Sequence, residues 1–467
     1  MTTDNTEDRE IEVVHEPRPP RTLVAVVGRP NVGKSTIFNR LVGRREAIVH
    51  DEPGVTRDRH YALVQSLGHT YTVVDTGGFD PESDDPMRQG IARQVQIAVS
   101  EADLVVCVLD AMQGPTDADR QAVKLLRKSS RPVIYVANKA DSARSELESS
   151  ELYRLGLDRI LPVSALHGRG FNALEDAIVK LLPPQTADLA PEAADPALLR
   201  VAIVGRPNAG KSSMVNRLAG EDRMLVDDRP GTTRDPVDTI VERDGLKLLL
   251  IDTAGIRRKS KVTKENDTVE VISVLRAMRS IDACDVVVLL CDATIGVAEQ
   301  DAKILGLAVD RARGAIIALN KIDQLDSSTY KKLEQDTRDK LSFAPWVPIV
   351  RTSALKGRGV GTLLRKLAEV QANFRKRIPT GELNRFFEKV LATHPPPTSG
   401  GSAPRLFYIT QAEASPPLFV VMSNAPAAVH FSYQRYVTNQ IRKHFGFEGV
   451  PVRVAYREKR KHKLGQR

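Results

Sequence analysis

A twelve-residue segment occurs twice in this 467-residue chain, and this repeat constrains the fold more than any other feature. Residues 24–35 read VAVVGRPNVGKS, and residues 201–212, which lie 177 positions later, read VAIVGRPNAGKS. Two further segments recur at the same offset: Pro53–Asp58 as Pro230–Asp235, and Asp75–Gly78 as Asp252–Gly255. Solenoid repeats have periods of roughly 20–50 residues, so a period this long predicts two whole domains.

Later parts of the repeat are farther apart. Asn138-Lys139-Ala140-Asp141 returns as Asn320-Lys321-Ile322-Asp323 after 182 positions, and Ser164-Ala165 returns as Ser353-Ala354 after 189. The second copy has therefore grown by insertions after Asp252. The stretch Arg257–Lys264, which holds five basic residues, is a candidate for one of them.

Short apolar runs alternate with helical patterns in each copy. Leu104–Leu109 and Val133–Ala137 are typical of strands, and Ala118–Arg127 between them is typical of a helix. Continuously apolar strands that alternate with helices indicate parallel sheets buried on both faces. Each copy is thus predicted to be a doubly wound α/β domain with its ligand at the carboxyl ends of the strands. Within such apolar strands, cysteines are expected to be reduced core residues, and none of Cys107, Cys284 and Cys291 forms a CxxC pair.

The order of segments predicts six regions. They are an acidic, disordered tail (1–20), a first α/β domain (21–182), a Pro/Ala-rich linker (183–197), a second α/β domain (198–374), a small C-terminal domain (375–457) and a basic tail (458–467). No apolar run reaches the roughly 18 residues of a membrane span, and no signal segment begins the chain, so we expect a cytoplasmic protein.

The basic charge of the chain belongs to its C-terminal fifth. Residues 376–467 hold 15 Lys/Arg and 5 Asp/Glu, a net charge of +10, whereas the whole chain carries +9. Such asymmetry predicts contact between this end and a polyanion such as nucleic acid.

The duplicated glycine-rich segment has the form GxxxxGK[ST], after an apolar strand and before a helical pattern. In this context glycines let backbone N–H groups surround phosphate oxygens, and the helix N-terminus adds positive charge. Lys34 and Lys211 are expected to reach the β- and γ-phosphates, and Ser35 and Ser212 to bind Mg²⁺. The predicted phosphate-binding residues are Gly28, Arg29, Pro30, Asn31, Val32, Gly33, Lys34 and Ser35, and Gly205, Arg206, Pro207, Asn208, Ala209, Gly210, Lys211 and Ser212.

Three further residue types complete each predicted phosphate site. Asp75 and Asp252 follow apolar stretches and suit a place near Mg²⁺. Gly78 and Gly255 are placed to sense the γ-phosphate through their backbone N–H groups. Thr56 and Thr233 lie in loops whose hydroxyl groups suit the Mg²⁺ shell when a triphosphate is bound.

The residues predicted to select the base are Asn138, Lys139 and Asp141 in the first copy and Asn320, Lys321 and Asp323 in the second. A carboxylate accepts two hydrogen bonds from N1–H and the 2-amino group of guanine. Adenine has neither donor at these positions, so the carboxylate discriminates strongly against it. Ser164-Ala165 and Ser353-Ala354 suit a backbone contact to the guanine oxygen. The predicted ligands are GTP and GDP.

The sequence resembles the double-Era-like GTPases, the bacterial Der (EngA) family, over nearly all of residues 22–457. The residues that carry the resemblance, beyond the motifs common to GTPases, are the duplicated segment Gly28–Ser35, Thr56-Arg57-Asp58, Asp75–Phe79, Gly114-Pro115-Thr116 and Asp252–Lys259. The resemblance implies two P-loop GTPase domains, a KH-like C-terminal domain and a role in assembly of the large (50S) ribosomal subunit.

Hydrolysis must work without the glutamine that Ras-type enzymes place after DxxG, since Phe79 and Ile256 occupy those positions. Arg57 and Arg234 remain open as arginine fingers. The carbonyl oxygens of Asn31 and Asn208 could hold a monovalent cation beside the phosphates, and similar GTPases with this Asn are activated by potassium. The alternative is that both asparagines only brace the loop.

The C-terminal domain is predicted to run helix (Glu382–Thr393), strand (Leu406–Thr410), strand (Leu418–Ser423), helix (Tyr433–Phe445) and strand (Val450–Tyr456). Gly446-Phe447-Glu448-Gly449 has the GxxG form that clamps nucleotides in KH domains, but Gly446 also suits the end of a helix. Five aromatic residues are expected in the core: Phe386, Phe387, Tyr433, Tyr436 and Phe445.

The leading hypothesis is a monomeric GTP-driven switch whose partner is the large ribosomal subunit and its rRNA. Two alternatives remain open: an RNA-binding scaffold with structural GTPase domains, and a GTPase acting in tRNA modification or membrane traffic. Lys34, Ser35, Asp75, Lys211, Ser212 and Asp252 are all present, which argues against lost catalysis in either copy.

Overall fold

The computed structural model describes residues 22–43, 61–76, 95–96, 98–99, 101–142, 149–182, 198–220, 238–243, 245–252, 266–397 and 404–458, without the side chains of 266–274. The acidic tail, the linker, Arg257–Lys264 and nearly all of the basic tail lie outside these ranges. One compact unit extends to Ala368 and contains both copies of the repeat, and another begins at Glu369. None of the helices in the described ranges has the length and apolar character that crossing a membrane requires.

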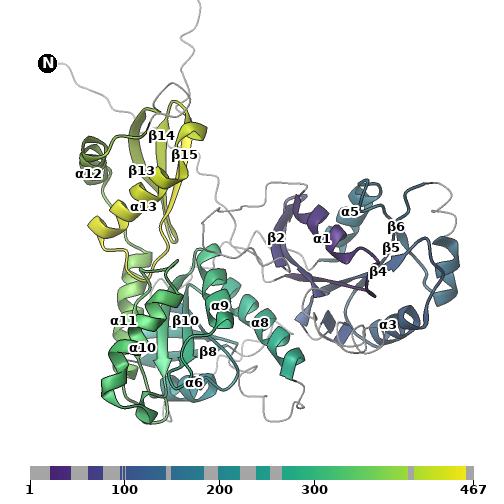
Figure 1. The fold of residues 1–467 in the computed structure, drawn as a ribbon, viewed down its shortest axis with the longest axis horizontal. Coiled ribbons are helices and arrows are strands. Elements are labelled where there is room, and N and C mark those ends of the chain that lie inside the picture. Colours follow the sequence, from purple (N-terminus) through teal and green to yellow (C-terminus); the bar gives the residue numbers. More distant parts are fainter. Residues whose placement is uncertain are drawn as a thin grey trace, which may run out of the picture. The chain divides into compact units, whose positions relative to one another are not determined.

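The first copy forms a six-stranded sheet in the order β2-β3-β1-β4-β5-β6 (Figure 1). All neighbouring strands run parallel except β2 and β3. The strands are β1 (Leu23–Val27), β2 (Tyr61–Ser66), β3 (His69–Asp75), β4 (Leu104–Asp110), β5 (Val133–Asn138) and β6 (Leu161–Pro162). The helices are α1 (Lys34–Gly43), α3 (Asp117–Arg127), the 3₁₀ helix η2 (Ser149–Leu155) and α5 (Phe171–Leu181).

Both faces of this sheet are buried, as the continuous apolar runs predict. Val24 and Val26 of β1 point to one face, where Ile37 of α1 and Phe171 of α5 cover them. The alternate residues of β1 point to the other face, which α3 covers with Ala122, Val123 and Leu126. Because side chains alternate along a strand, only a sheet covered on both faces accepts an uninterrupted apolar sequence.

The second copy repeats the architecture, with β8 and β9 antiparallel and the other neighbouring strands parallel. Its strands are β7 (Leu198–Val204), β8 (Thr239–Arg243), β9 (Leu246–Ile251), β10 (Val286–Asp292), β11 (Gly314–Asn320) and β12 (Ile349–Arg351). Its helices are α6 (Lys211–Ala219), α8 (Asn266–Ala283), α9 (Glu299–Asp310), η4 (Ile322–Gln324), η5 (Ser327–Thr329), α10 (Tyr330–Lys340) and α11 (Val360–Phe374). The predicted fold class is confirmed, and all three cysteines are buried and free.

The C-terminal unit has the predicted order of elements: α12 (Thr380–Thr393), β13 (Leu406–Ala414), β14 (Pro417–Ser423), η6 (Pro426–Ala428), α13 (Phe431–Phe445) and β15 (Arg453–Glu458). β14 pairs antiparallel with β13 and parallel with β15, which includes Glu458, the first residue of the predicted tail. α12 and α13 pack their apolar residues against the sheet (Figure 1).

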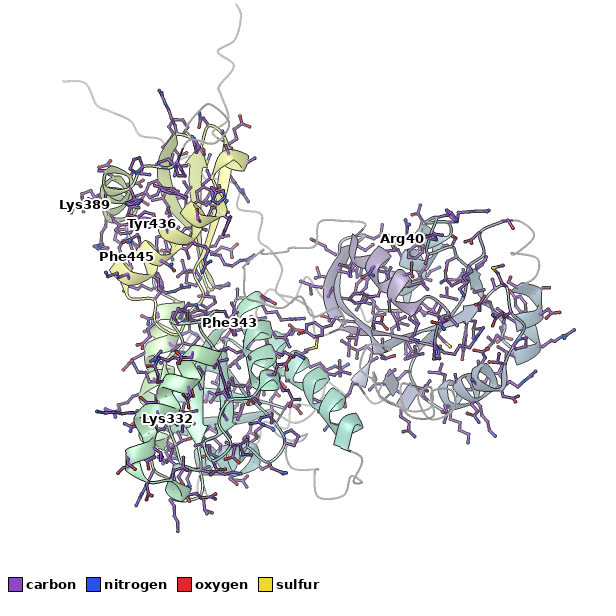
Figure 2. All side chains as sticks on the ribbon, in the orientation of Figure 1. Arg40, Lys332, Phe343, Lys389, Tyr436 and Phe445 are labelled. Atoms are coloured by element: carbon purple, nitrogen blue, oxygen red, sulfur yellow. The ribbon has the colours of Figure 1, made fainter. Side chains whose placement is uncertain are left out.

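Most aromatic side chains of this unit lie in its core, as predicted. Phe386, Phe387, Tyr433 and Phe445 are buried, and Tyr436 packs beside them as a partly buried residue (Figure 2 labels Tyr436 and Phe445). The GxxG segment serves this core as well. Gly446 ends α13 in a left-handed conformation with φ 69°, and its N–H donates to the Arg442 carbonyl.

Phe447, the residue after Gly446, is fully buried and packs on Phe419. A side chain needed in the core fixes the backbone around it, so the segment 446–449 acts as a helix terminator with an apolar anchor. This agrees with the interpretation of Gly446 as a helix end.

Two candidate nucleotide-binding sites

Each glycine-rich loop joins the carboxyl end of a central strand to a helix N-terminus: β1 to α1, and β7 to α6. Lys34 Nζ donates to the carbonyl oxygens of Gly28 and Arg29 at 2.8 and 2.9 Å. In the second copy Lys211 Nζ donates to the matching carbonyls of Gly205 and Arg206 at 2.7 and 2.6 Å. Each lysine ammonium group thus folds back onto its own loop and is held there by two backbone carbonyl groups.

Asn138 and Asn320 fasten the base-selecting motifs to these loops. Asn138 Nδ2 donates to the Val32 carbonyl at 2.8 Å, and Asn320 Nδ2 donates to the Ala209 carbonyl at 2.8 Å. Gly33 (φ 91°) is essential to this approach, since a Cβ there would lie 2.2 Å from Asn138 Nδ2. These asparagines therefore hold the phosphate loop and the base motif in one rigid arrangement.

The two predicted Mg²⁺-binding positions of the first copy lie together. Ser35 Oγ donates to Asp75 Oδ2 at 2.6 Å, and Asp75 is buried. Burial lowers the pKa of the Lys34 ammonium, an effect that the Asp75 carboxylate opposes. A hydroxyl and a carboxylate oxygen beside this lysine form the hard-oxygen donor set that Mg²⁺ prefers.

The matching region of the second copy differs in its backbone. Asp252 adopts a left-handed conformation with φ 58°, and its N–H donates to Asp238 Oδ1 at 3.1 Å. Left-handed backbone costs a non-glycine residue roughly 1–2 kcal/mol. The end of β9 is thus held in a strained arrangement by a neighbouring carboxylate, whereas Asp75 ends β3 as part of the strand.

The base-selecting residues of the first copy form a connected network. Ser164 Oγ donates to Asp141 Oδ1 at 2.5 Å, and the Ala165 N–H donates to Asn138 Oδ1 at 3.0 Å. Lys139 Nζ lies 2.7 Å from Asp110 Oδ2. The network places an exposed carboxylate beside a backbone loop and a lysine, which is the chemistry that guanine requires.

The second copy builds the same network. The Ala354 N–H donates to Asn320 Oδ1 at 2.9 Å, and Lys321 Nζ lies 2.5 Å from Asp292 Oδ2. A hydrogen bond from the Ser353 hydroxyl lowers the pKa of Asp323. Asp323 is therefore ionised at neutral pH, as an acceptor for two guanine N–H groups must be.

The arginine of each glycine-rich loop turns its side chain away from the loop. Arg29 Nη2 donates to Gln113 Oε1 at 2.7 Å, and its Nε lies 3.5 Å from Asp119 Oδ2. Arg206 Nε lies 2.9 Å from the buried Asp301 Oδ2. The backbone carbonyl of each arginine therefore contacts the lysine of the loop. Its side chain anchors the loop to the first turn of the following helix, which is α3 in the first copy and α9 in the second.

Several structural residues of the sites were not identified from the sequence. Arg40 Nε and Nη2 donate to the carbonyls of Ala165 and Leu166 at 2.5 and 2.6 Å (Figure 2), and Arg217 makes the matching bonds to Ala354 and Leu355. Asp110 and Asp119 were also missed, together with their counterparts Asp292 and Asp301. A signal existed: each pair recurs at the repeat offsets of 177 or 182.

Not every predicted residue can be placed. Thr56, Gly78, Thr233 and Gly255 lie outside the described residues, as do Phe79 and Ile256. Asn31 and Asn208 are described and exposed, and both have left-handed backbone, with φ 65° and 63°. Among the described residues neither side chain has a hydrogen-bond partner.

The C-terminal unit carries exposed cations on several elements. Arg385 and Lys389 lie on α12, and Arg435 and Lys443 on α13, all exposed to solvent (Figure 2 labels Lys389). The basic excess predicted from the sequence is therefore on the surface.

Comparison with known proteins agrees with this geometry. A family described as 50S ribosome-binding GTPase matches residues 23–139 and 200–321, and a family described as the KH-domain-like C-terminal domain of EngA bacterial GTPase enzymes matches residues 377–457. The chain is similar to the GTPase Der of Geotalea daltonii, with 43% identity covering 95% of this chain and 100% of that protein. It is similar to GTPase Der of Moorella thermoacetica, with 45% identity covering 94% and 99%, and of Symbiobacterium thermophilum, with 44% identity covering 96% and 94%.

The fold and the paired sites define a GTPase with two nucleotide-binding domains in tandem and a KH-like domain at the C-terminus. The chain belongs to the Der family of GTPases, and it binds and hydrolyses GTP.

Proposed function

We propose that this GTPase is a switch that assists assembly of the large ribosomal subunit, and that its nucleotide state controls its binding to rRNA. One observation carries the proposal: two matching arrangements of glycine-rich loop, lysine and base-motif asparagine share a chain with a KH-like domain that exposes cations on two helices. A nucleotide switch linked to a polyanion-binding surface is suited to bind RNA in one state and release it in the other.

Lys34 and Lys211 hold the phosphates in this proposal. Each ammonium exchanges its loop carbonyl partners for β- and γ-phosphate oxygens when a nucleotide binds, so that its charge is placed where negative charge develops. Loop N–H groups and the helix N-termini of α1 and α6 stabilise the same oxygens.

The residues that would hold Mg²⁺ are Ser35 and Asp75 in the first copy, and Ser212 and Asp252 in the second. The 2.6 Å contact between Ser35 and Asp75 supports a shared ligand at that point. When bound, the metal neutralises the β- and γ-phosphates. The sequence gives Thr56 and Thr233 a place in its shell, and Gly78 and Gly255 a contact to the γ-phosphate, and we retain these as proposals.

Guanine would be selected by Asp141 and Asp323, each oriented by a neighbouring serine. The N–H groups of Ala165 and Ala354 support this role because Asn138 and Asn320 hold them beside the base motif. Potassium would be held by the Asn31 and Asn208 carbonyl groups, whose exposure to solvent supports that role.

The division into GTPase domains at 21–182 and 198–374 and a KH-like domain at 375–457 remains our proposal, as do the monomeric state and the cytoplasmic location. We propose that rRNA contacts the exposed basic surface of the KH-like domain. The buried Phe447 leaves the GxxG segment a structural role, so we assign no clamp to it.

The test is co-sedimentation with isolated large ribosomal subunits, with a non-hydrolysable GTP analogue and with GDP. We expect binding with the analogue and release with GDP. Equal binding in both states, combined with negligible GTP turnover, would instead support a scaffold. Binding in neither state would contradict a large-subunit role.

A further inference from the structure

A cationic surface lies on the first GTPase domain, away from the residues of its nucleotide site. It consists of four exposed side chains near and along α3 and one on the neighbouring 3₁₀ helix η2, and we name it the α3 cationic face: Arg120, Lys124, Arg127, Lys128 and Arg154. These side chains line a shallow cavity of about 330 Å³. The basic excess of the C-terminal domain does not include any of them.

The helix geometry explains how the cations gather. Positions separated by four, seven and eight residues lie on one side of an α-helix, so Arg120, Lys124, Arg127 and Lys128 point the same way. They extend over about 12 Å at 1.5 Å per residue. Arg154 adds a fifth cation from η2.

The cavity is supported from beneath and from one end. Val123 and Leu155 are buried and form its apolar floor. The Arg127 guanidinium donates to the Gly156 carbonyl, which directs this side chain toward η2. The face is therefore an organised surface on a packed helix.

In the part of the chain that the structure describes, few acidic groups neutralise this face. Arg120 and the exposed Asp117 approach to 3.9 Å, a contact that solvent screens strongly because both side chains are exposed. Within the described ranges, Lys124, Lys128 and Arg154 form no salt bridge with a carboxylate. Like charges four residues apart destabilise a helix slightly, so the folded domain gains nothing from this arrangement.

The second GTPase domain shows that the fold does not require the cations. At the offset of 182, the core positions of α3 return as Ile304, Leu305 and Ala308 of α9, all buried. The four cationic positions return as Ala302, Gly306, Val309 and Asp310. Gly306 is buried and Ala302 and Val309 pack against the core, so the second domain covers this side of the helix, whereas the first domain leaves it exposed and cationic.

We propose that the α3 cationic face binds the phosphate backbone of RNA as a contact of its own, separate from the KH-like domain. A row of lysines and arginines over about 12 Å suits the regular charges of a nucleic-acid strand, which it neutralises without reading sequence. The choice of RNA as the partner rests on the proposed function. The competing partner is an acidic protein segment.

The experiment uses the full chain with Lys124→Glu/Lys128→Glu, two exposed lysines that keep the Arg127 contact intact. The matched control is Lys331→Glu/Lys332→Glu on α10, which has the same charge change on two exposed lysines. The probes are a 20-base-pair RNA duplex and a 30-nucleotide single strand, whose affinities are measured over a series of KCl concentrations. GTP turnover of each variant verifies that the domain is folded.

We expect the α3 variant to bind RNA about tenfold more weakly and to lower the slope of log K against log[salt] by about 1.5, as loss of two phosphate contacts requires. The control should shift affinity less than twofold. Unchanged affinity and slope in the α3 variant, while Arg435→Glu/Lys443→Glu on α13 abolishes binding, overturns this inference alone. Failure of the unmodified chain to bind either RNA overturns both this inference and the RNA role of the KH-like domain. Tighter, Lys124-dependent binding of polyglutamate would assign the face to an acidic protein.

Discussion

The two GTPase domains match closely at the glycine-rich loop and at the base-selecting residues, and they differ at the aspartate of the DTxG segment and on the outer surface. Asn138 and Asn320 make the same pair of hydrogen bonds, to a loop carbonyl and from an alanine N–H. In contrast, Asp75 is a strand residue bonded to Ser35, whereas Asp252 has a left-handed backbone bonded by Asp238. The two domains therefore share the arrangement of the base-selecting residues and differ in the backbone at this aspartate.

The largest effect is expected from removing the loop lysines one at a time. Lys34→Ala should lower turnover at the first site by about 10²–10³-fold, since it removes a preorganised positive charge at the phosphates, and Lys211→Ala should do the same at the second. Single-turnover measurements on each variant then report the rate of the remaining site. Lys180→Ala, an exposed lysine on α5, is the control. If either variant kept the full rate of both sites, the catalytic role of that lysine would be wrong.

The next largest effect tests the feature that the domains share. Asp141→Asn and Asp323→Asn should each weaken GTP binding at their own site by about 10²-fold, since two charge-assisted hydrogen bonds are lost. Xanthosine triphosphate should bind these variants better than GTP, because asparagine donates to the 2-oxo group that replaces the 2-amino group. Titration with both nucleotides is the measurement. Unchanged GTP preference in one variant would break the equivalence of the two base sites.

A smaller effect concerns potassium. GTP turnover should be several-fold faster in KCl than in NaCl at equal ionic strength, because a cation beside the phosphates neutralises negative charge that develops during phosphoryl transfer. Asn31→Gly and Asn208→Gly keep a backbone that tolerates positive φ but remove the carboxamide. Each should reduce the stimulation at its own site. Equal rates in both salts would eliminate the potassium proposal in both domains.

Most of the fold was predictable from the sequence, for a physical reason. Uninterrupted apolar strands require a sheet covered on both faces, and the repeat offset aligned every motif of one domain with the other. The missed residues Arg40, Asp110 and Asp119 act through contacts to loops far along the chain. Arg40, for example, bonds Ala165 across 125 positions. No local pattern announces such a contact, although the recurrence of each residue at the repeat offset does point to it.

The surface of α3 shows a second limit of sequence reasoning. Its cations are spread through an ordinary amphipathic pattern, and the net charge of residues 1–375 is close to zero. Only the folded structure shows that Arg154 of η2 lies beside Lys124 and Lys128 of α3. The uneven distribution of charge along the sequence was enough to identify the basic C-terminal domain. A cationic patch within a domain of nearly zero net charge could be identified only from the structure.

The smallest expected effect sharpens the comparison of the two base sites through pH. Because the Ser353 hydroxyl lowers the pKa of Asp323, this carboxylate remains charged below its ordinary titration range. GTP binding at the second site needs the ionised Asp323 carboxylate. The affinity is therefore complete above the ordinary pKa of an aspartate and is lost as pH falls through the lowered pKa of Asp323. The stability that this hydrogen bond contributes is lost over the same window.

Ser353→Ala should therefore raise the pKa of Asp323, and GTP affinity should begin to fall at a higher pH than in the unmodified protein. The measurement is a titration of GTP affinity from neutral pH to about pH 3, below the ordinary Asp pKa, in Lys34→Ala protein, in which the first site is weakened. Ser353→Thr, which retains a hydroxyl, should restore the original profile, because the shift depends on this donor. Identical profiles for the alanine and serine proteins would mean that the hydrogen bond only shapes the loop, where Ser353 Oγ also accepts from the Lys356 N–H at 3.1 Å.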